Sequence, residues 1–354
     1  MLIIFDVPRL ELERENLDII ENLYSELLRA SINGIHLVVM TREVSNWGLE
    51  NLSLNRRETA HLKLIKQIYT QNAGLIEISF CSLSIEIGED GLTEPTPHNY
   101  RISHKELLEG NYLSESILLV ENIENDGQLY KHILGEVKNS HKVKSFNFSL
   151  RNGGGSTIVS VFQHEIQNEK VVVCICDSDK YAPNDTISST YRNLKGLSRR
   201  HKFIGLLSET IGREAENIIP LDIIKDTYLC PNYENYDQLE ELLELQNTAI
   251  HNDCLWLFLD IKNGLNGEEL LQRGKLPATL QWIQSKYLRD NNSEILNIDV
   301  PGFGDAVIGQ FLNSWEAKSA FHSFFRSNYW TLHFKEFFEQ IYWYFVSNKI
   351  QAVN

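Results

Sequence analysis

The sequence contains little glycine and little proline, with 20 and 8 residues of each among 354. This scarcity argues against collagen-like repeats, low-complexity segments and a long flexible linker. No stretch reaches the length and apolar character of a transmembrane helix, and the apolar start at residues 2–5 has no basic leader before it. The sequence therefore predicts a globular protein of the cytoplasm.

Cysteine is also scarce, and the five residues are scattered: Cys81, Cys174, Cys176, Cys230 and Cys254. Only Cys174 and Cys176 are close in sequence, and one pair cannot complete a tetrahedral zinc site. We interpret the cysteines as structural thiols in a reducing compartment.

Positive charge is in the minority, because 33 Lys and Arg stand against 48 Asp and Glu and give a formal net charge of −15. A protein that binds nucleic acid over its whole surface needs a basic surface, so that class is excluded. A single basic groove beside an acidic metal site is still compatible with this charge.

The hydrophobic pattern divides the chain into units, and its length suits two or three domains. Apolar, β-branched runs alternate with helical spacing in two separate stretches. We expect strands at residues 2–5, 35–40 and 75–80 in the first stretch, and at 116–122, 143–150 and 169–179 in the second. This alternation predicts two α/β domains with parallel strands. We interpret the first as a Rossmann-like structural or partner-binding domain. A PIN-like nuclease domain is the alternative, because Asp6 ends its first strand, but this aspartate has no clear partner carboxylates. The predicted units are a small α/β domain, a polar linker, a second α/β domain and a helical C-terminal region, over residues 1–88, 89–113, 114–230 and 231–354.

Acidic residues follow the predicted strands of the second α/β domain. Glu121 ends the first strand with Asp126 shortly after it, Asp177 and Asp179 end the third, and Glu216 lies beyond the fourth. The carboxyl ends of parallel strands meet at one edge of a sheet, so we expect these side chains to gather there. Clustered carboxylates repel each other, and a hard divalent cation such as Mg²⁺ or Mn²⁺ would hold them together.

The residues in this domain resemble those of a known family. The segments ILLVEN, GGGS, CICDSD and GREAEN are similar to a TOPRIM domain, particularly the version in OLD (overcoming lysogenization defect) nucleases and their standalone relatives. Glu121 stands at the family's glutamate, and Asp177 and Asp179 stand at its Asp-x-Asp. Residues 213–217 match its Arg-Glu-Ile-Glu-Asn-like motif. The resemblance covers about residues 112–230.

The resemblance implies a TOPRIM-like sheet and metal-assisted hydrolysis of phosphodiester bonds. One cation would lower the pKa of an attacking water, and a second would stabilise the leaving oxygen. We expect Glu121, Asp177 and Asp179 to bind the metal, with Asp126 and Glu216 completing a second position. Glu121 is also the candidate general acid or base. Whether one or two cations bind is open.

Two positions complicate the match to the family. Asn122 stands where the family has glycine, and asparagine tolerates a left-handed backbone, so we expect the turn to survive. The catalytic lysine of the family corresponds either to Lys180, next to the Asp pair, or to Lys195, on a basic helix. The sequence does not decide between these two lysines.

Two further segments suggest contact with nucleic acid. A glycine loop between a strand and a helix is predicted to contact phosphate through its backbone, although a capped tight turn is the alternative. A basic helix without acidic residues suits the phosphate backbone, and a solvated surface helix is its alternative. The residues concerned are Gly153, Gly154, Gly155 and Ser156 in the loop, and Arg192, Lys195, Arg199 and Arg200 in the helix.

The segment from Trp315 to Phe345 is crowded with aromatic residues. Their spacing is that of a buried helical stripe, which favours core packing or a subunit interface over stacking on single-stranded bases. A homo-oligomer is therefore one expected form of the protein.

Three functions compete for this sequence. The first is a Mg²⁺-dependent endonuclease that acts on DNA, with RNA as the alternative, in a prokaryotic antiviral defence or DNA-processing system. Because no Walker A sequence is present, ATP-driven control would need a separate ATPase subunit. The second is a non-catalytic TOPRIM-fold subunit of a multi-protein defence complex. A sugar-nucleotide transferase with a metal-binding Asp-x-Asp is third, and it explains neither Glu121 nor residues 213–217.

Overall fold

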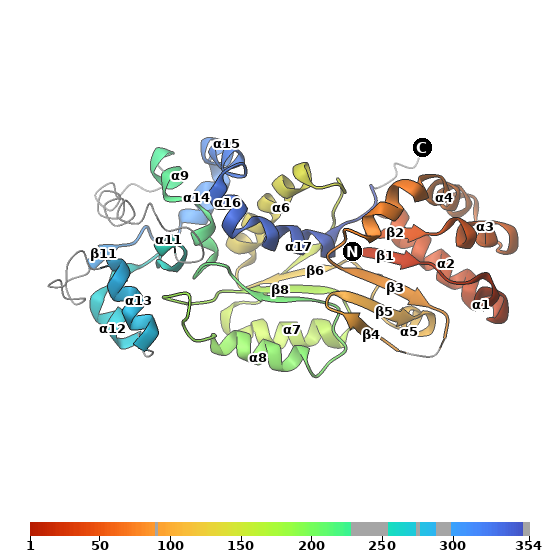
Figure 1. The fold of residues 1–354 in the computed structure, drawn as a ribbon, viewed down its shortest axis with the longest axis horizontal. Coiled ribbons are helices and arrows are strands. Elements are labelled where there is room, and N and C mark those ends of the chain that lie inside the picture. Colours follow the sequence, from red (N-terminus) through yellow and green to blue (C-terminus); the bar gives the residue numbers. More distant parts are fainter. Residues whose placement is uncertain (89–90, 228–253, 274–276, 288–298, 350–354) are drawn as a thin grey trace.

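The protein is described here by a computed structural model, and it has a mixed α/β architecture with two sheets built mainly from parallel strands (Figure 1). The two sheets lie side by side, helices pack against them, and a smaller group of helices lies beyond the second sheet. The structure describes residues 1–88, 91–227, 254–273, 277–287 and 299–349. Cys230 lies outside these ranges.

The first sheet has the strand order β2-β1-β3-β5-β4, in which only β4 runs antiparallel to its neighbour. Its strands are β1 (Leu2–Phe5), β2 (Leu37–Met40), β3 (Ser82–Glu86), β4 (Thr93–Thr96) and β5 (Asn99–Ser103). Its helices are α1 (Arg9–Arg14), α2 (Leu17–Ile32), α3 (Arg42–Asn51), α4 (Arg56–Ile76) and α5 (His104–Glu109). Buried residues of β1 and β2 form the centre of its core.

Two sequence predictions differ from this sheet. Residues 93–109, for which we expected a linker, form β4, β5 and α5, and β5 pairs with β3. The strand expected at 75–80 is instead the end of α4 and the turn after it. In both places the true strand alternates apolar and polar residues, so it lacks the continuous apolar run that identifies a fully buried strand.

The second sheet is entirely parallel, with the order β7-β6-β8-β9. Its strands are β6 (Ile117–Val120), β7 (Ser149–Asn152), β8 (Val172–Cys176) and β9 (Gly205–Glu209), and the main crossover helices are α6 (Gln128–Ser140), α7 (Ile158–Gln167) and α8 (Ser189–Ser198). Both faces of the central strands β6 and β8 are buried, as their apolar sequences predict. Leu118 and Val173 face the core shared with the first sheet, whereas Leu119 and Val172 pack with α7 and α8 on the other face.

The strand order places a topological switch point between β6 and β8. From β6 the chain crosses to β7 on one side, and it then returns past β6 to β8 on the other side. In open α/β sheets the crevice at such a point, beyond the carboxyl ends of the strands, is the usual place for a ligand. Glu121 follows β6 and Asp177 follows β8, so both lie at this point.

The described part of the C-terminal region is mostly helical, and it also contains a small antiparallel sheet of two strands. Its described elements are α9 (Leu221–Asp226), α11 (Leu255–Phe258), β10 (Gly264–Asn266), α12 (Gly267–Arg273), α13 (Pro277–Tyr287), β11 (Asp299–Pro301), α14 (Val307–Asn313), α15 (Trp315–Phe324), α16 (Asn328–His333) and α17 (Lys335–Phe345). A 3-10 turn at Ala215–Ile218 precedes α9.

The aromatic segment is largely core, which confirms that part of its prediction. Phe338 on α17 is fully buried and its ring lies 5.9 Å from that of Tyr130 on α6. The Tyr344 and Tyr100 hydroxyls both donate to the Gly205 carbonyl, at 3.2 and 3.1 Å, and so connect α17 to both sheets. Trp315 is the exception, with 74% of its surface exposed.

Two findings bear on the environment of the protein. Within the described ranges, no helix combines the length and the apolar character that crossing a membrane requires. The four described cysteines are free thiols, and three of them are buried in the core.

Candidate functional site

The switch point brings two of the predicted ligands into direct contact. The Asp177 backbone N–H donates to the Glu121 Oε1 at 3.2 Å, so the Glu121 carboxylate turns toward the end of β8. Both side chains are half-buried. The adjacency of β6 and β8 in the sheet therefore places the Glu121 carboxylate beside the Asp177 backbone.

Asp126 lies in a single π-helical turn, Ile123–Gly127, directly after β6. Its Oδ2 accepts the Asn122 N–H at 3.0 Å, and the side chain is 7% exposed. Asn122 has an extended backbone, with φ of −129°, and its side-chain oxygen accepts the N–H groups of Glu124 and Asn125. We expected a left-handed backbone at this position, but Asn122 is extended. Its side chain caps the following turn instead.

Asp179 is positioned by a left-handed backbone, with φ of +54°, which aspartate adopts more readily than most residues. Its N–H donates to the Arg213 carbonyl at 3.1 Å, and its own carbonyl accepts from the Arg213 guanidinium at 3.1 Å. The buried Ser178 between the two aspartates donates its N–H to Thr210 Oγ1 at 3.0 Å. The Asp-x-Asp loop is thus fixed by backbone contacts, while the Asp179 side chain is exposed.

The motif at residues 213–217 contributes buried acids to the cluster and also holds a distant segment in place. Its Glu214 and Glu216 side chains are buried, 8% and 1% exposed, beside the other acids. Its Asn217 amide donates to the carbonyls of Trp256 and Leu259, at 2.6 and 2.9 Å. The asparagine therefore fixes a segment far along the chain against the edge of the second sheet.

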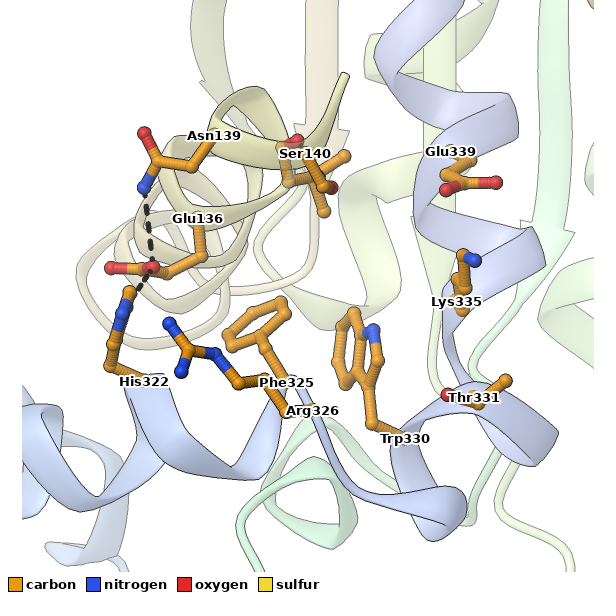
Figure 2. Close-up of a pocket in the computed structure, with 11 residues that line it drawn as sticks. Glu136, Asn139, Ser140, His322, Phe325, Arg326, Trp330, Thr331, Lys335 and Glu339 are labelled. Atoms are coloured by element: carbon orange, nitrogen blue, oxygen red, sulfur yellow. Dashed lines mark hydrogen bonds and ion pairs between the residues drawn. The ribbon is translucent and has the colours of Figure 1, made fainter.

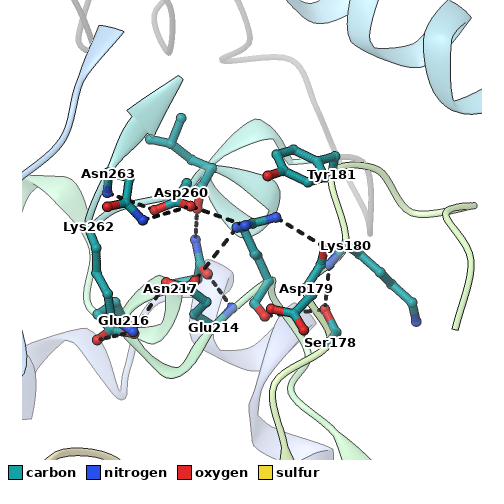
Figure 3. A network of polar contacts seen from close by, with 12 residues as sticks. Ser178, Asp179, Lys180, Tyr181, Glu214, Glu216, Asn217, Asp260, Lys262 and Asn263 are labelled. Carbon is teal, nitrogen blue, oxygen red and sulfur yellow. Dashed lines mark hydrogen bonds and ion pairs between the residues drawn. The ribbon is translucent and has the colours of Figure 1, made fainter. Parts of the chain in front are cut away.

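That fixed segment supplies a functional candidate that the sequence did not suggest. The Lys262 ammonium lies 3.2 Å from Glu216 Oε1 and 3.5 Å from Glu214 Oε2 (Figure 3). Lys180 points away from these acids and pairs with Glu209 at 2.7 Å. Lys195 lies over the Tyr191 ring on α8. Of these three lysines, Lys262 is the one whose ammonium contacts Glu214 and Glu216.

Burial, together with repulsion between neighbouring acids, raises the pKa values of the acids in this cluster. Burial is the main cause that raises the pKa of Asp126 to about 6 and that of Glu214 to about 7. Burial also raises the pKa of Asp177, followed by the charges of Asp126 and Glu121. Burial alone would lower the pKa of Lys262, but the facing glutamates more than offset it, so this pKa is raised. The raised pKa keeps the lysine positively charged at neutral pH.

These shifts predict a pH-dependent loss of stability in the metal-free protein. A carboxyl whose pKa is higher in the folded state stabilises the fold fully below its unfolded pKa, near 4, and loses this effect as the pH rises through its folded value. For Asp126 the window is therefore pH 4 to about 6. Replacing Asp126 with asparagine should remove about 2 kcal/mol of the fall in unfolding free energy over this window.

Urea unfolding at pH 4.5 and pH 7, in the presence of a chelator, measures this difference. Glu124→Gln is the matched control, because Glu124 is exposed in the same turn. Equal pH dependence in Asp126→Asn and the wild type would contradict the assignment.

The carboxylate groups of these acids suit a hard cation, although in the described ranges they do not form a complete coordination site. All the candidate donors are carboxylate oxygens, which Mg²⁺ prefers. Glu216 Oε2 is buried without a hydrogen-bond partner among the described residues, so this oxygen is available to a further ligand. However, no group of three or more His, Cys, Asp or Glu side chains in the described ranges is placed to hold a metal ion.

The glycine loop lies at the same edge of the sheet but uses part of its backbone internally. The N–H groups of Gly153 and Gly154 donate to the carbonyls of Val120 and Glu121, at 2.7 and 2.9 Å. These two amides are therefore engaged and do not face a phosphate. The loop instead fixes the end of β6, and so the position of Glu121, while Gly154 and Gly155 have the positive φ that a tight turn requires.

The basic residues of α8 are distributed along the helix and not gathered at the acids. Arg192 lies in the first turn, near the carboxyl end of β9, and is exposed. Arg199 and Arg200 are exposed at the other end, seven and eight residues later, which is about 10 Å along a helix axis. Only the Arg192 end of this surface is thus close to the edge that bears the acids.

A separate cavity of about 300 Å³ lies between α6 and the C-terminal helices (Figure 2). Phe325 and Trp330 form its apolar wall, and His322 pairs with Glu136 at 2.6 Å at its rim. None of the predicted metal ligands lines it. The cavity and the acidic cluster are therefore different features of the molecule.

Comparison with known proteins adds no support from similarity. No protein family model matches the chain, and neither the curated proteins nor the solved structures contain a match to it. A functional assignment must therefore rest on the residues and their geometry.

Proposed function

We propose that the protein is a metal-dependent nuclease with a TOPRIM-like catalytic domain, which hydrolyses phosphodiester bonds in nucleic acid. The main support is the contact of Glu121 with Asp177 at the switch point of the second sheet, with Asp126 and Glu216 buried beside them. Acids brought together from distant segments, at the edge where ligands bind, are costly unless they bind a cation.

In this proposal Glu121, Asp177 and Asp179 would bind Mg²⁺ or Mn²⁺, and Asp126 and Glu216 would extend the site. A bound cation would make a water more acidic and polarise the phosphate. Glu121 could then accept the proton of the attacking water, because its pKa is raised, first by burial.

Lys262 takes the place of the lysine that the family resemblance requires. It is the lysine that the described contacts bring to Glu214 and Glu216, whereas Lys180 is paired with Glu209. Its ammonium would offset negative charge where a phosphate approaches the acids.

The remaining assignments are proposals from the resemblance. We propose DNA as the substrate, with the Arg192 end of α8 as its contact, and a cytoplasmic role in antiviral defence that involves a separate ATPase subunit. RNA is the alternative substrate for the Arg192 end of α8. A homo-oligomer is a separate proposal, which comes from the aromatic C-terminal segment.

Cleavage assays test the proposal directly. Plasmid, single-stranded DNA and RNA would be incubated with the protein in Mg²⁺, in Mn²⁺ and in a chelator. We expect metal-dependent cleavage, and Glu121→Gln should slow it about 100-fold, because a charged ligand and proton acceptor becomes a neutral amide. Glu124→Gln, an exposed neighbour, should cleave like the wild type. Equal cleavage by Glu121→Gln and the wild type would refute the assignment.

A second candidate function has one observation in its favour. The Lys262 ammonium already neutralises part of the cluster, and no metal-binding group is formed by the described residues. A non-catalytic TOPRIM-fold subunit would show this combination. Titration with Mn²⁺ separates the two functions, because the non-catalytic subunit should bind no metal and cleave nothing.

A further inference from the structure

Lys262 reaches the acids from a turn whose backbone is firmly held. The Asp260 carboxylate, at the start of this turn, accepts from Arg213 at 3.1 Å and from the Asn263 N–H at 2.8 Å. The Gly304 N–H donates to the Lys262 carbonyl at 2.9 Å. A Cβ on Gly302 would lie 2.1 Å from that carbonyl, so only glycine allows this approach.

The side chain of Lys262, in contrast, is not enclosed. It is 25% exposed, and its ammonium is joined to the fixed backbone by a flexible four-carbon chain. The ammonium can therefore move toward solvent without any change in the turn. The structure thus joins a fixed backbone to a long, partly exposed side chain.

The ammonium does not complete the site that it occupies. It pairs with Glu216 through Oε1, whereas Glu216 Oε2 is buried and has no hydrogen-bond partner in the described part of the chain. One positive charge also faces several acids, since Asp126, Glu121 and Asp177 lie within its electrostatic reach. The unpartnered oxygen and the neighbouring carboxyl groups are thus oxygen donors that the single ammonium does not use.

We propose that Lys262 is a tethered counter-ion that competes with divalent cations for the acids around Glu216. In the metal-free protein its ammonium pairs with Glu214 and Glu216, and when a divalent cation binds there, the ammonium leaves these carboxylates. The inference rests on the proposed function, because it concerns the same acids. It adds that metal binding is an exchange of one cation for another, and that the lysine sets the metal concentration at which the site fills.

The charge of the lysine determines the expected effect. A divalent cation must displace an ammonium that lies within about 4 Å of two carboxylates, and even in a water-like dielectric the lost attraction corresponds to at least about a 10-fold change in affinity. Replacing Lys262 with methionine should therefore tighten Mn²⁺ binding at least about 10-fold. The same change should lower the melting temperature of the metal-free protein, and Mn²⁺ should restore it.

Calorimetric titration of the full chain with MnCl₂ at constant pH measures this affinity. Lys262→Arg keeps the charge and should bind Mn²⁺ like the wild type, and so should Lys195→Met, whose ammonium lies on α8. Unchanged or weaker binding by Lys262→Met, while the wild type binds Mn²⁺, would overturn the inference and leave the proposed nuclease standing. If neither protein binds Mn²⁺, the proposed function fails and the inference fails with it.

A second measurement needs no variant and so does not depend on the folding of Lys262→Met. Acetic anhydride labels free amines, and mass spectrometry measures the labelled fraction of Lys262 with and without Mg²⁺. We expect several-fold more labelling of Lys262 with saturating Mg²⁺, because the ammonium has left its carboxylates, and no change at Lys195. Equal or lower labelling of Lys262 in Mg²⁺ would contradict the exchange.

Discussion

Asp177→Ala is expected to reduce metal-dependent cleavage on the order of 10³-fold. Asp177 follows β8 at the switch point, and its carboxylate interacts with those of Asp126, Glu121 and Glu216. Without the Asp177 carboxylate, a cation would no longer be held at this site. The loss of about 4 kcal/mol of transition-state stabilisation corresponds to a decrease in rate of about 10³-fold. Single-turnover cleavage of the substrate identified with the wild type measures the effect.

The same variant should not be less stable than the wild type when metal is absent. Burial and the neighbouring acids raise the pKa of Asp177, so its charge opposes folding in the metal-free state. Melting in a chelator should therefore occur at the wild-type temperature or above it, which separates lost chemistry from lost folding. Asp222→Ala removes an exposed acid on α9 and should leave cleavage unchanged. Full cleavage by Asp177→Ala would remove the basis of the nuclease proposal.

The sequence predicted the second sheet and its acidic edge because both depend on local patterns. Continuous apolar runs identified β6 and β8, and the acids that follow these strands meet because the strands are neighbours. The strand expected over 143–150 was less accurate, since β7 spans Ser149–Asn152. The rings of Phe146 and Phe148, which suggested the earlier start, pack instead on aromatic residues of α17 such as Tyr342 and Phe345.

Lys262 could not be predicted, because its position depends on contacts between distant segments. It lies beyond the region of resemblance, 46 residues after Glu216, and the Asn217 and Arg213 contacts bring it to the acids. Lys180 was a reasonable prediction from its place beside Asp179. The left-handed backbone at Asp179 redirects the chain, and the Lys180 side chain pairs with Glu209 at the end of β9.

The residues of the motif at 213–217 have two different roles: some are candidate metal ligands, and others hold a neighbouring segment in place. The sequence suggested that its acids bind metal, and it offered no role for the arginine and asparagine. In the structure these two residues hold the segment that bears Lys262, while Glu214 and Glu216 face the lysine. The motif therefore connects the acidic edge of the sheet to the C-terminal region.

Arg213→Met is expected to lower the free energy of unfolding by about 3–5 kcal/mol, because it breaks a buried ion pair from one side. The arginine is 3% exposed, its guanidinium pairs with Asp260 at 3.1 Å and donates to the Asp179 carbonyl, and it stacks on Tyr181 at 4.0 Å. Methionine fills similar volume but leaves the Asp260 carboxylate buried without its cation. Urea unfolding measures the change.

The double variant Arg213→Met with Asp260→Asn tests the physical cause. If the cost comes from an unpaired buried charge, neutralising Asp260 should recover part of it, so the double variant should be more stable than the sum of the single changes predicts. Arg213→Lys keeps the charge but loses the planar fork that reaches both Asp260 and Asp179, and its cost should be intermediate. Additive losses would show that packing on Tyr181 is the main contribution. In either case the turn that bears Lys262 loses its contact with the sheet, so the arginine variants should lose both Mn²⁺ affinity and stability. Lys262→Met, in contrast, should raise the Mn²⁺ affinity and lower the stability of the metal-free protein.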